Sequence, residues 1–146
     1  MTSQVTSYAI SEIRPDKYTN TQVQGTVKLL QHHNGVPGVT RTALFIELTG
    51  LVPNGLHGFA IHENGELQEG CQNAGGHYNP FGRNHGPQWA EDRHVGSLGN
   101  IWADEHGVVK GYLEDHLVQL IGPNTVIGRS IVVHVHPDDM GGGPNH

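Results

Sequence analysis

Apolar residues in this chain recur with a period of two, and this spacing constrains the fold more than any other feature. Residues 22–29 and 42–48 alternate polar and apolar side chains and are bounded by Gly, Pro or Asn. Similar short stretches lie at residues 8–13, 58–62, 100–103, 108–113 and 131–135. Because no stretch has the periodicity of an amphipathic helix, the sequence predicts an all-β sandwich or barrel of short antiparallel strands.

The length of 146 residues predicts a single domain over residues 1–146, with a mobile tail at residues 141–146. A net charge of −6 without runs of Lys or Arg argues against nucleic acid or an anionic membrane as the partner. The apolar stretches are too short to span a bilayer, and the N-terminus lacks the pattern of a signal peptide. Because a mature secreted protein would look the same, we expect an extracellular rather than a cytoplasmic location.

Residues 63–97 form a predicted connection of about 35 residues, far longer than an ordinary loop. His77, His85 and His94 recur within it in a glycine-rich context, whereas His62 and His134 lie on predicted strands. One loop histidine alone would more often be a solvated polar residue. Five in this arrangement instead predict a metal site, since neutral imidazole is a good ligand for zinc and copper.

Several motifs follow one another along nearly the whole chain: GLHGFAIHE, AGGHYNP, DRHVGSLGN, an IGR at residues 127–129, and VVH followed by DDMG. With this series of motifs the chain resembles the copper/zinc superoxide dismutases. The resemblance implies a Greek-key β-barrel of eight strands whose long loops hold the metals outside the barrel.

The resemblance also implies a role for each site residue. It implies that zinc is bound by His77, His85 and His94, that copper is bound by His62 and His134, and that His77 bridges the two metals. Asp138 matches an aspartate that orients metal-binding histidines, here His85 alone. Two positions depart from the family pattern: Ala60 replaces a fourth copper histidine, and Ser97 replaces the aspartate that completes the zinc site. Because a serine hydroxyl is a poor ligand, water or a neighbouring carboxylate is expected beside the zinc histidines.

These departures predict a dismutase-like protein that keeps about one zinc per chain, binds copper weakly and is not an efficient enzyme. Its role would be metal binding or self-assembly, as in the histidine-rich bivalve haemolymph proteins that it also resembles. The alternative is a working superoxide dismutase with three copper histidines. A copper-delivery domain is disfavoured, because no second cysteine stands near Cys71 in a metal-transfer motif.

The resemblance further implies a guiding arginine, a cysteine partner for Cys71 and a closing strand, none of which follows His146 in this sequence. We therefore expect a barrel that lacks its C-terminal closing strand. An open sheet edge tends to pair with another chain, so a homo-oligomer is expected. Cys71 would then be either a reduced thiol or part of a disulfide between chains.

Overall fold

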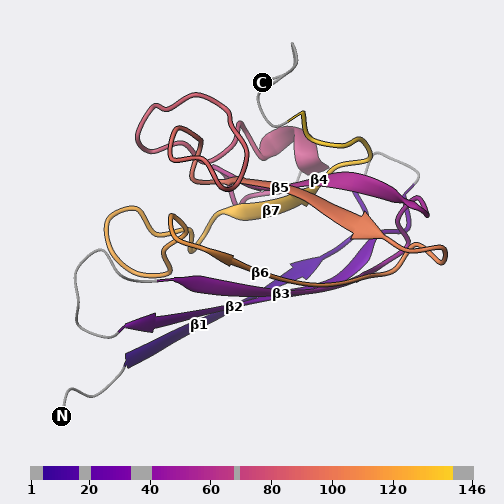
Figure 1. Ribbon diagram of the computed structural model, residues 1–146, viewed down its shortest axis with the longest axis horizontal. Coiled ribbons are helices and arrows are strands. Elements are labelled where there is room, and N and C mark those ends of the chain that lie inside the picture. The colour runs from indigo at the N-terminus through magenta and orange to yellow at the C-terminus, as the bar shows by residue number, and fades with distance from the viewer. Residues whose placement is uncertain (1–4, 17–20, 34–40, 68–69, 140–146) are drawn as a thin grey trace.

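The computed structural model describes residues 5–16, 21–33, 41–67 and 70–139, which form two antiparallel β-sheets (Figure 1). The four-stranded sheet has the order β1-β2-β3-β6, and the three-stranded sheet has the order β5-β4-β7. Each predicted strand corresponds to one of these strands, so the all-β prediction is confirmed. Their bounds are β1 (Val5–Ile13), β2 (Gln24–His33), β3 (Thr42–Thr49), β4 (Gly55–His62), β5 (Ser97–Ala103), β6 (Val109–Asp115) and β7 (Ser130–Val133).

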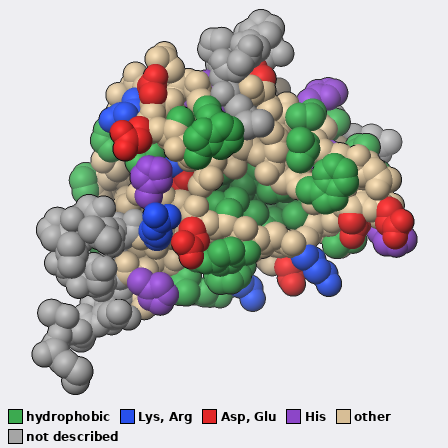
Figure 2. All heavy atoms as spheres, in the orientation of Figure 1, with side chains coloured by type: hydrophobic (Ala, Val, Ile, Leu, Met, Phe, Trp, Pro, Cys, Tyr) green, Lys and Arg blue, Asp and Glu red, His purple; other side chains and the backbone are tan. Residues whose placement is uncertain are grey.

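The four-stranded sheet buries one face and exposes the other. In β3, Leu44, Ile46 and Leu48 are buried, whereas Phe45 and Glu47 between them are exposed. This alternation follows directly from the period of two in the sequence. The inward side chains join those of the second sheet in one hydrophobic core. Burying each such side chain contributes roughly 1.5–3 kcal/mol. Figure 2 shows apolar side chains at the centre of one face of the molecule, among scattered charged ones.

Strand β4 departs from this alternation because it is buried on both faces from His57 to His62. Phe59 and Ile61 point into the core. The opposite face is covered by the long connection between β4 and β5, which includes the 3-10 helix η1 (Gly70–Asn73) and lies on the outer side of the second sheet (Figure 1). The connection is fastened to β4 by backbone hydrogen bonds from Ile61 N to Gly96 O at 2.9 Å and from Tyr78 N to Ile61 O at 2.8 Å. The long connection therefore packs against the outer face of β4.

A β-bulge shifts the pairing of β4 with β5 where the long connection packs on β4. Gly58 pairs with Asn100, but Ala60 pairs with Ser97, so β5 uses one extra residue between the two pairs. Gly99 supplies the bulge with a φ of 77°, a conformation that glycine adopts without strain. Ala60 and Ser97 are consequently direct cross-strand partners.

Two predictions concern the C-terminal part of the chain. The predicted mobile tail at residues 141–146 lies outside the described residues. The absence of a closing strand is not tested by the described strands and stays a prediction. Within the described ranges, no helix is long and apolar enough to cross a membrane.

Candidate metal centre

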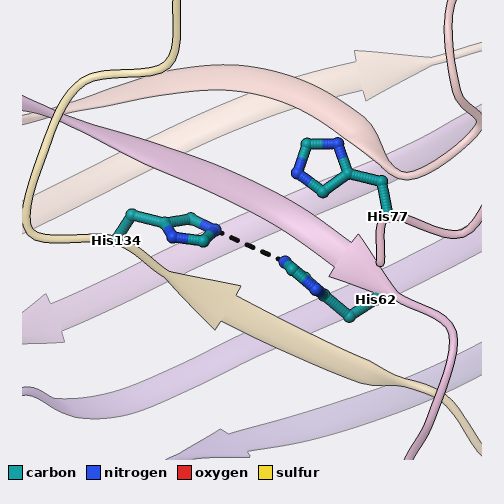
Figure 3. A group of neighbouring side chains, drawn as sticks. All are labelled: His62, His77 and His134. Carbon is teal, nitrogen blue, oxygen red and sulfur yellow. Dashed lines mark hydrogen bonds between the residues drawn. The ribbon is translucent and has the colours of Figure 1, made fainter. Parts of the chain in front are cut away.

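The strand ends bring two histidines together. His62 ends β4 and His134 directly follows β7, and their Nε2 atoms lie 3.4 Å apart (Figure 3). Backbone hydrogen bonds extend the pairing of β4 beyond β7, from His134 N to Gly58 O at 2.8 Å and from Gly58 N to His136 O at 2.9 Å. Glycine suits this close pairing, because a Cβ at position 58 would lie 3.3 Å from His136 O, which is tighter than most Cβ contacts. The sheet itself thus positions this pair.

His77 connects this pair to the loop histidines. It forms an isolated β-bridge with His62, and its ring stands edge-on to the His62 ring at 5.0 Å between centroids (Figure 3). One potential ligand atom from each of His62, His77 and His134 lies within 4.8 Å of the others, and the same is true of His77, His85 and His94. We call these groups the strand cluster and the loop cluster. His77 belongs to both, as the sequence predicts.

The loop cluster is organised around the Nδ1 atoms. His94 Nδ1 lies 3.3 Å from His77 Nδ1, and Ser97 Oγ lies 3.1 Å from His77 Nδ1 and 3.0 Å from His85 Nδ1. Ser97 is 1% exposed, so its hydroxyl is enclosed by the cluster.

Burial lowers the pKa of four of these histidines and so keeps their imidazoles in the form that binds metal. Desolvation lowers the pKa of His62, His94 and His134. Desolvation, followed by repulsion from the neighbouring histidines, lowers the pKa of His77 to about 4. A neutral imidazole has a free lone pair, whereas an imidazolium has none. The donor set of both clusters therefore fits zinc or copper at neutral pH.

Asp138 lies where the sequence predicts, beside His85. Its Oδ1 accepts a hydrogen bond from His85 Nε2 at 2.8 Å, and Asp139 Oδ1 is 3.6 Å from the same nitrogen. Asn100 holds this turn from β5: its Oδ1 accepts from Asp138 N at 2.6 Å. Because Nε2 donates to a carboxylate, the Nδ1 atom of His85 keeps its lone pair for the loop cluster.

A buried ion pair anchors the segment that carries His94 and Ser97. Arg93 donates from Nη2 to Asp115, and both side chains are fully buried. Arg93 Nη1 also donates to the carbonyl of Ser97 at 2.6 Å. Asp115 lies at the end of β6, so the ion pair connects this end of the loop to the four-stranded sheet.

His57 is a site residue that the sequence reasoning missed. It is 3% exposed, and its ring nitrogens lie 2.9 Å from the carbonyl oxygens of His134 and Val52. The contact with the His134 carbonyl supports the backbone that carries this member of the strand cluster. The GLHGFAIHE motif contains His57, but its spacing from the other histidines does not indicate a contact through the backbone.

Five histidines, two from strand ends and three from the long loop, converge on one side of an antiparallel β-sandwich. This arrangement is that of a metalloprotein class with two adjoining candidate metal sites. The family model of copper/zinc superoxide dismutase matches residues 23–146. A Cu-Zn superoxide dismutase of Candida glabrata is 49% identical over 123 residues, covering 84% of this chain and 77% of that protein. The chain belongs to the copper/zinc superoxide dismutase family, and this membership implies zinc and copper as cofactors.

Other similar proteins are also named Cu-Zn superoxide dismutases. A Cu-Zn superoxide dismutase of Saccharomyces cerevisiae is 46% identical over 121 residues, covering 83% of this chain and 76% of that protein. An extracellular Cu-Zn superoxide dismutase of Brugia pahangi is 43% identical over 138 residues, covering 94% of this chain and 64% of that protein.

These findings correct one expectation from the sequence. The interpretation of Ala60 and Ser97 as signs of a protein that has lost efficient dismutation is wrong, because relatives 44–49% identical over most of the chain are named Cu-Zn superoxide dismutases. The physical reason lies in the geometry. The ligand atoms of His62, His77 and His134 lie within 4.8 Å of one another, so the strand cluster forms with an alanine at position 60.

Proposed function

We propose that this protein is a copper/zinc superoxide dismutase that converts superoxide to oxygen and hydrogen peroxide. The observation that carries the proposal is the convergence of five histidines into two clusters that share His77, in a chain of this family. In this proposal the strand cluster of His62, His77 and His134 holds copper, and the loop cluster of His77, His85 and His94 holds zinc. Copper would supply the cycling between oxidation states that the reaction requires.

The chain's own residues have separate tasks in this proposal. His77 uses Nδ1 in the loop cluster, so its Nε2 is the atom that remains for the strand cluster and for holding or releasing a proton. His57 fixes the backbone of His134, and Asp138 orients His85. The histidines of both clusters contribute no negative charge, so bound cations would make this site attractive to an anion in a chain of net charge −6.

The proposal is tested by measuring superoxide consumption by the full chain after loading with copper and zinc. We expect copper-dependent activity that His134→Ala reduces at least about tenfold, the loss expected when a group that holds the metal is removed. His106→Ala is the matched control, because this histidine is 77% exposed in a turn away from both clusters. A loaded protein no more active than the metal-free chain, or an equal response to the two substitutions, would overturn the proposal.

Two further proposals concern location and assembly. The Brugia pahangi relative is named an extracellular enzyme, which supports an extracellular location for this protein. Among the described strands, β7 is an outer strand of its sheet, which supports pairing of this edge with a second copy. Fractionation of expressing cells tests the first proposal. Sedimentation equilibrium at high concentration tests the second, and a strictly monomeric mass would contradict it.

A further inference from the structure

The loop cluster contains a fourth polar atom at a spacing suited to metal coordination. Zinc bonds of about 2.0–2.1 Å in a tetrahedron place neighbouring ligand atoms about 3.3 Å apart. The separations from His77 Nδ1 to His94 Nδ1, from His77 Nδ1 to Ser97 Oγ and from His85 Nδ1 to Ser97 Oγ are 3.3, 3.1 and 3.0 Å. The serine oxygen therefore has the spacing of a ligand.

The hydrogen bonds of the Ser97 hydroxyl give a reason why its oxygen would bind the ion. Ser97 Oγ contacts the Nδ1 atoms of His77 and His85, whose lone pairs an ion in the loop cluster would take. The hydroxyl would then lose both of these partners at a position that is 1% exposed. A buried hydroxyl without hydrogen-bond partners is destabilising, and direct binding to the ion removes this cost.

Neighbouring carboxylates are poorly placed for the same role. Asp138 and Asp139 approach His85 at its Nε2 atom, at 2.8 and 3.6 Å. The loop cluster meets the opposite side of the ring, at Nδ1. A carboxylate on the Nε2 side orients the histidine and lies away from the point where the Nδ1 atoms converge.

We propose that Ser97 Oγ is the fourth ligand of the ion held by His77, His85 and His94, which makes this a site of four uncharged donors. This inference rests on the proposed zinc role of the loop cluster. It assigns coordination to a residue that the sequence reasoning treated as a poor ligand. A site without a carboxylate leaves the full charge of the ion uncompensated, so its affinity is expected to be lower than that of the same site with aspartate at position 97.

Cobalt(II) is the probe, because its absorption spectrum reports the donor atoms. The experiment uses the full chain in a Cys71→Ser background, so that position 97 can be tested without another thiol. Ser97→Cys is expected to bind cobalt with a new thiolate-to-cobalt charge-transfer band, which only a directly coordinated sulfur produces. The matched control is Ser97→Ala, which is expected to bind cobalt and zinc at least about tenfold more weakly and to lack the band.

A second series keeps the inference testable if the cysteine variant does not fold. Zinc affinity measured by chelator competition is expected to fall in the order Ser97→Asp, wild type, Ser97→Ala. Cobalt binding by Ser97→Cys without the new band, or equal zinc affinities of wild type and Ser97→Ala, overturns the role of Ser97. Either result leaves the dismutase proposal standing if loaded wild-type protein is active. Failure of the wild-type loop cluster to bind either metal overturns both this inference and the proposed zinc site.

Discussion

The two metal clusters share His77 but are held by different kinds of structure. The strand cluster takes His62 and His134 from the ends of paired strands, where the backbone ladder fixes them. The loop cluster takes its histidines from the long connection, which depends on buried side-chain interactions such as that between Arg93 and Asp115. The sheet therefore positions the strand cluster, whereas the loop cluster depends on a few polar side chains in addition to the backbone hydrogen bonds that join its loop to β4.

The clusters also differ in the side chain that lies beside their histidines. In the strand cluster, position 60 presents a methyl group that cannot bind a metal. In the loop cluster, position 97 presents a hydroxyl that contacts two of the histidines. The comparison indicates that the loop cluster can still have four donors from the chain, whereas the strand cluster has three.

The largest expected effect concerns the bracing of the loop cluster. Arg93→Met removes one partner of a fully buried ion pair and is expected to destabilise the metal-free protein by about 3–5 kcal/mol. Urea unfolding measures this loss. The matched control is Arg14→Met, whose partner Glu12 and own side chain are 65% and 76% exposed. It should change the stability by about 1 kcal/mol or less. Similar losses for both variants would contradict the proposed bracing.

A second prediction adds a fourth donor to the strand cluster. Ala60→His is expected to raise copper affinity about a hundredfold, because structural sites of four ligands gain about 3 kcal/mol per ligand. Competition with a copper chelator measures the change. Ala60→Phe adds comparable bulk at this 2% exposed position without a donor and should not strengthen binding. Equal affinities in the two variants would show that the cluster does not include the outer face of β4 at position 60.

A third prediction tests whether the two clusters are separate sites by removing the carboxylate that orients His85. Asp138→Asn weakens the hydrogen bond to His85 Nε2 and is expected to lower zinc affinity about 10–100-fold. Copper affinity should change less, because His85 is part of the loop cluster and not of the strand cluster. Asp139→Asn is the control, since that carboxylate is 3.6 Å from the ring. An equal loss of copper and zinc affinity would mean that the clusters do not act as separate sites.

Sequence reasoning predicted the strands well because alternation of side chains is a local property. The five histidines could be grouped from their spacing and from family motifs, and the structure brings them together. The resemblance placed Ser97 at the zinc site, but its hydrogen bonds to two histidine rings and the contacts of His57 could not be predicted, because they depend on the path of the loop and on the bulge at Gly99. A one-residue shift in the pairing of β5 determines that position 97 lies beside Ala60, and no local pattern specifies that shift.

The last prediction tests whether positions 60 and 97 act together. They are direct cross-strand partners, so their side chains share one face of the sheet. Ala60→His and Ser97→Asp would place an imidazole and a carboxylate side by side. A double-mutant cycle on the metal-free protein is expected to show a favourable coupling of about 0.5–1 kcal/mol, within the range for residues in contact. Pairing Ala60→His with Glu105→Gln, at an exposed position in the turn between β5 and β6, provides the additive control.

The sign of this coupling decides how the comparison between the clusters should be understood. A favourable coupling means that a substitution beside one cluster changes the structure in which the other cluster binds its metal. The small residues Ala60 and Ser97 would then depend on each other, since a larger side chain at one position would affect the packing at the other. Additive effects would mean that the methyl group and the hydroxyl act independently, because residues that do not interact change stability separately. In that case each cluster could be altered without regard to its neighbour, although both use His77.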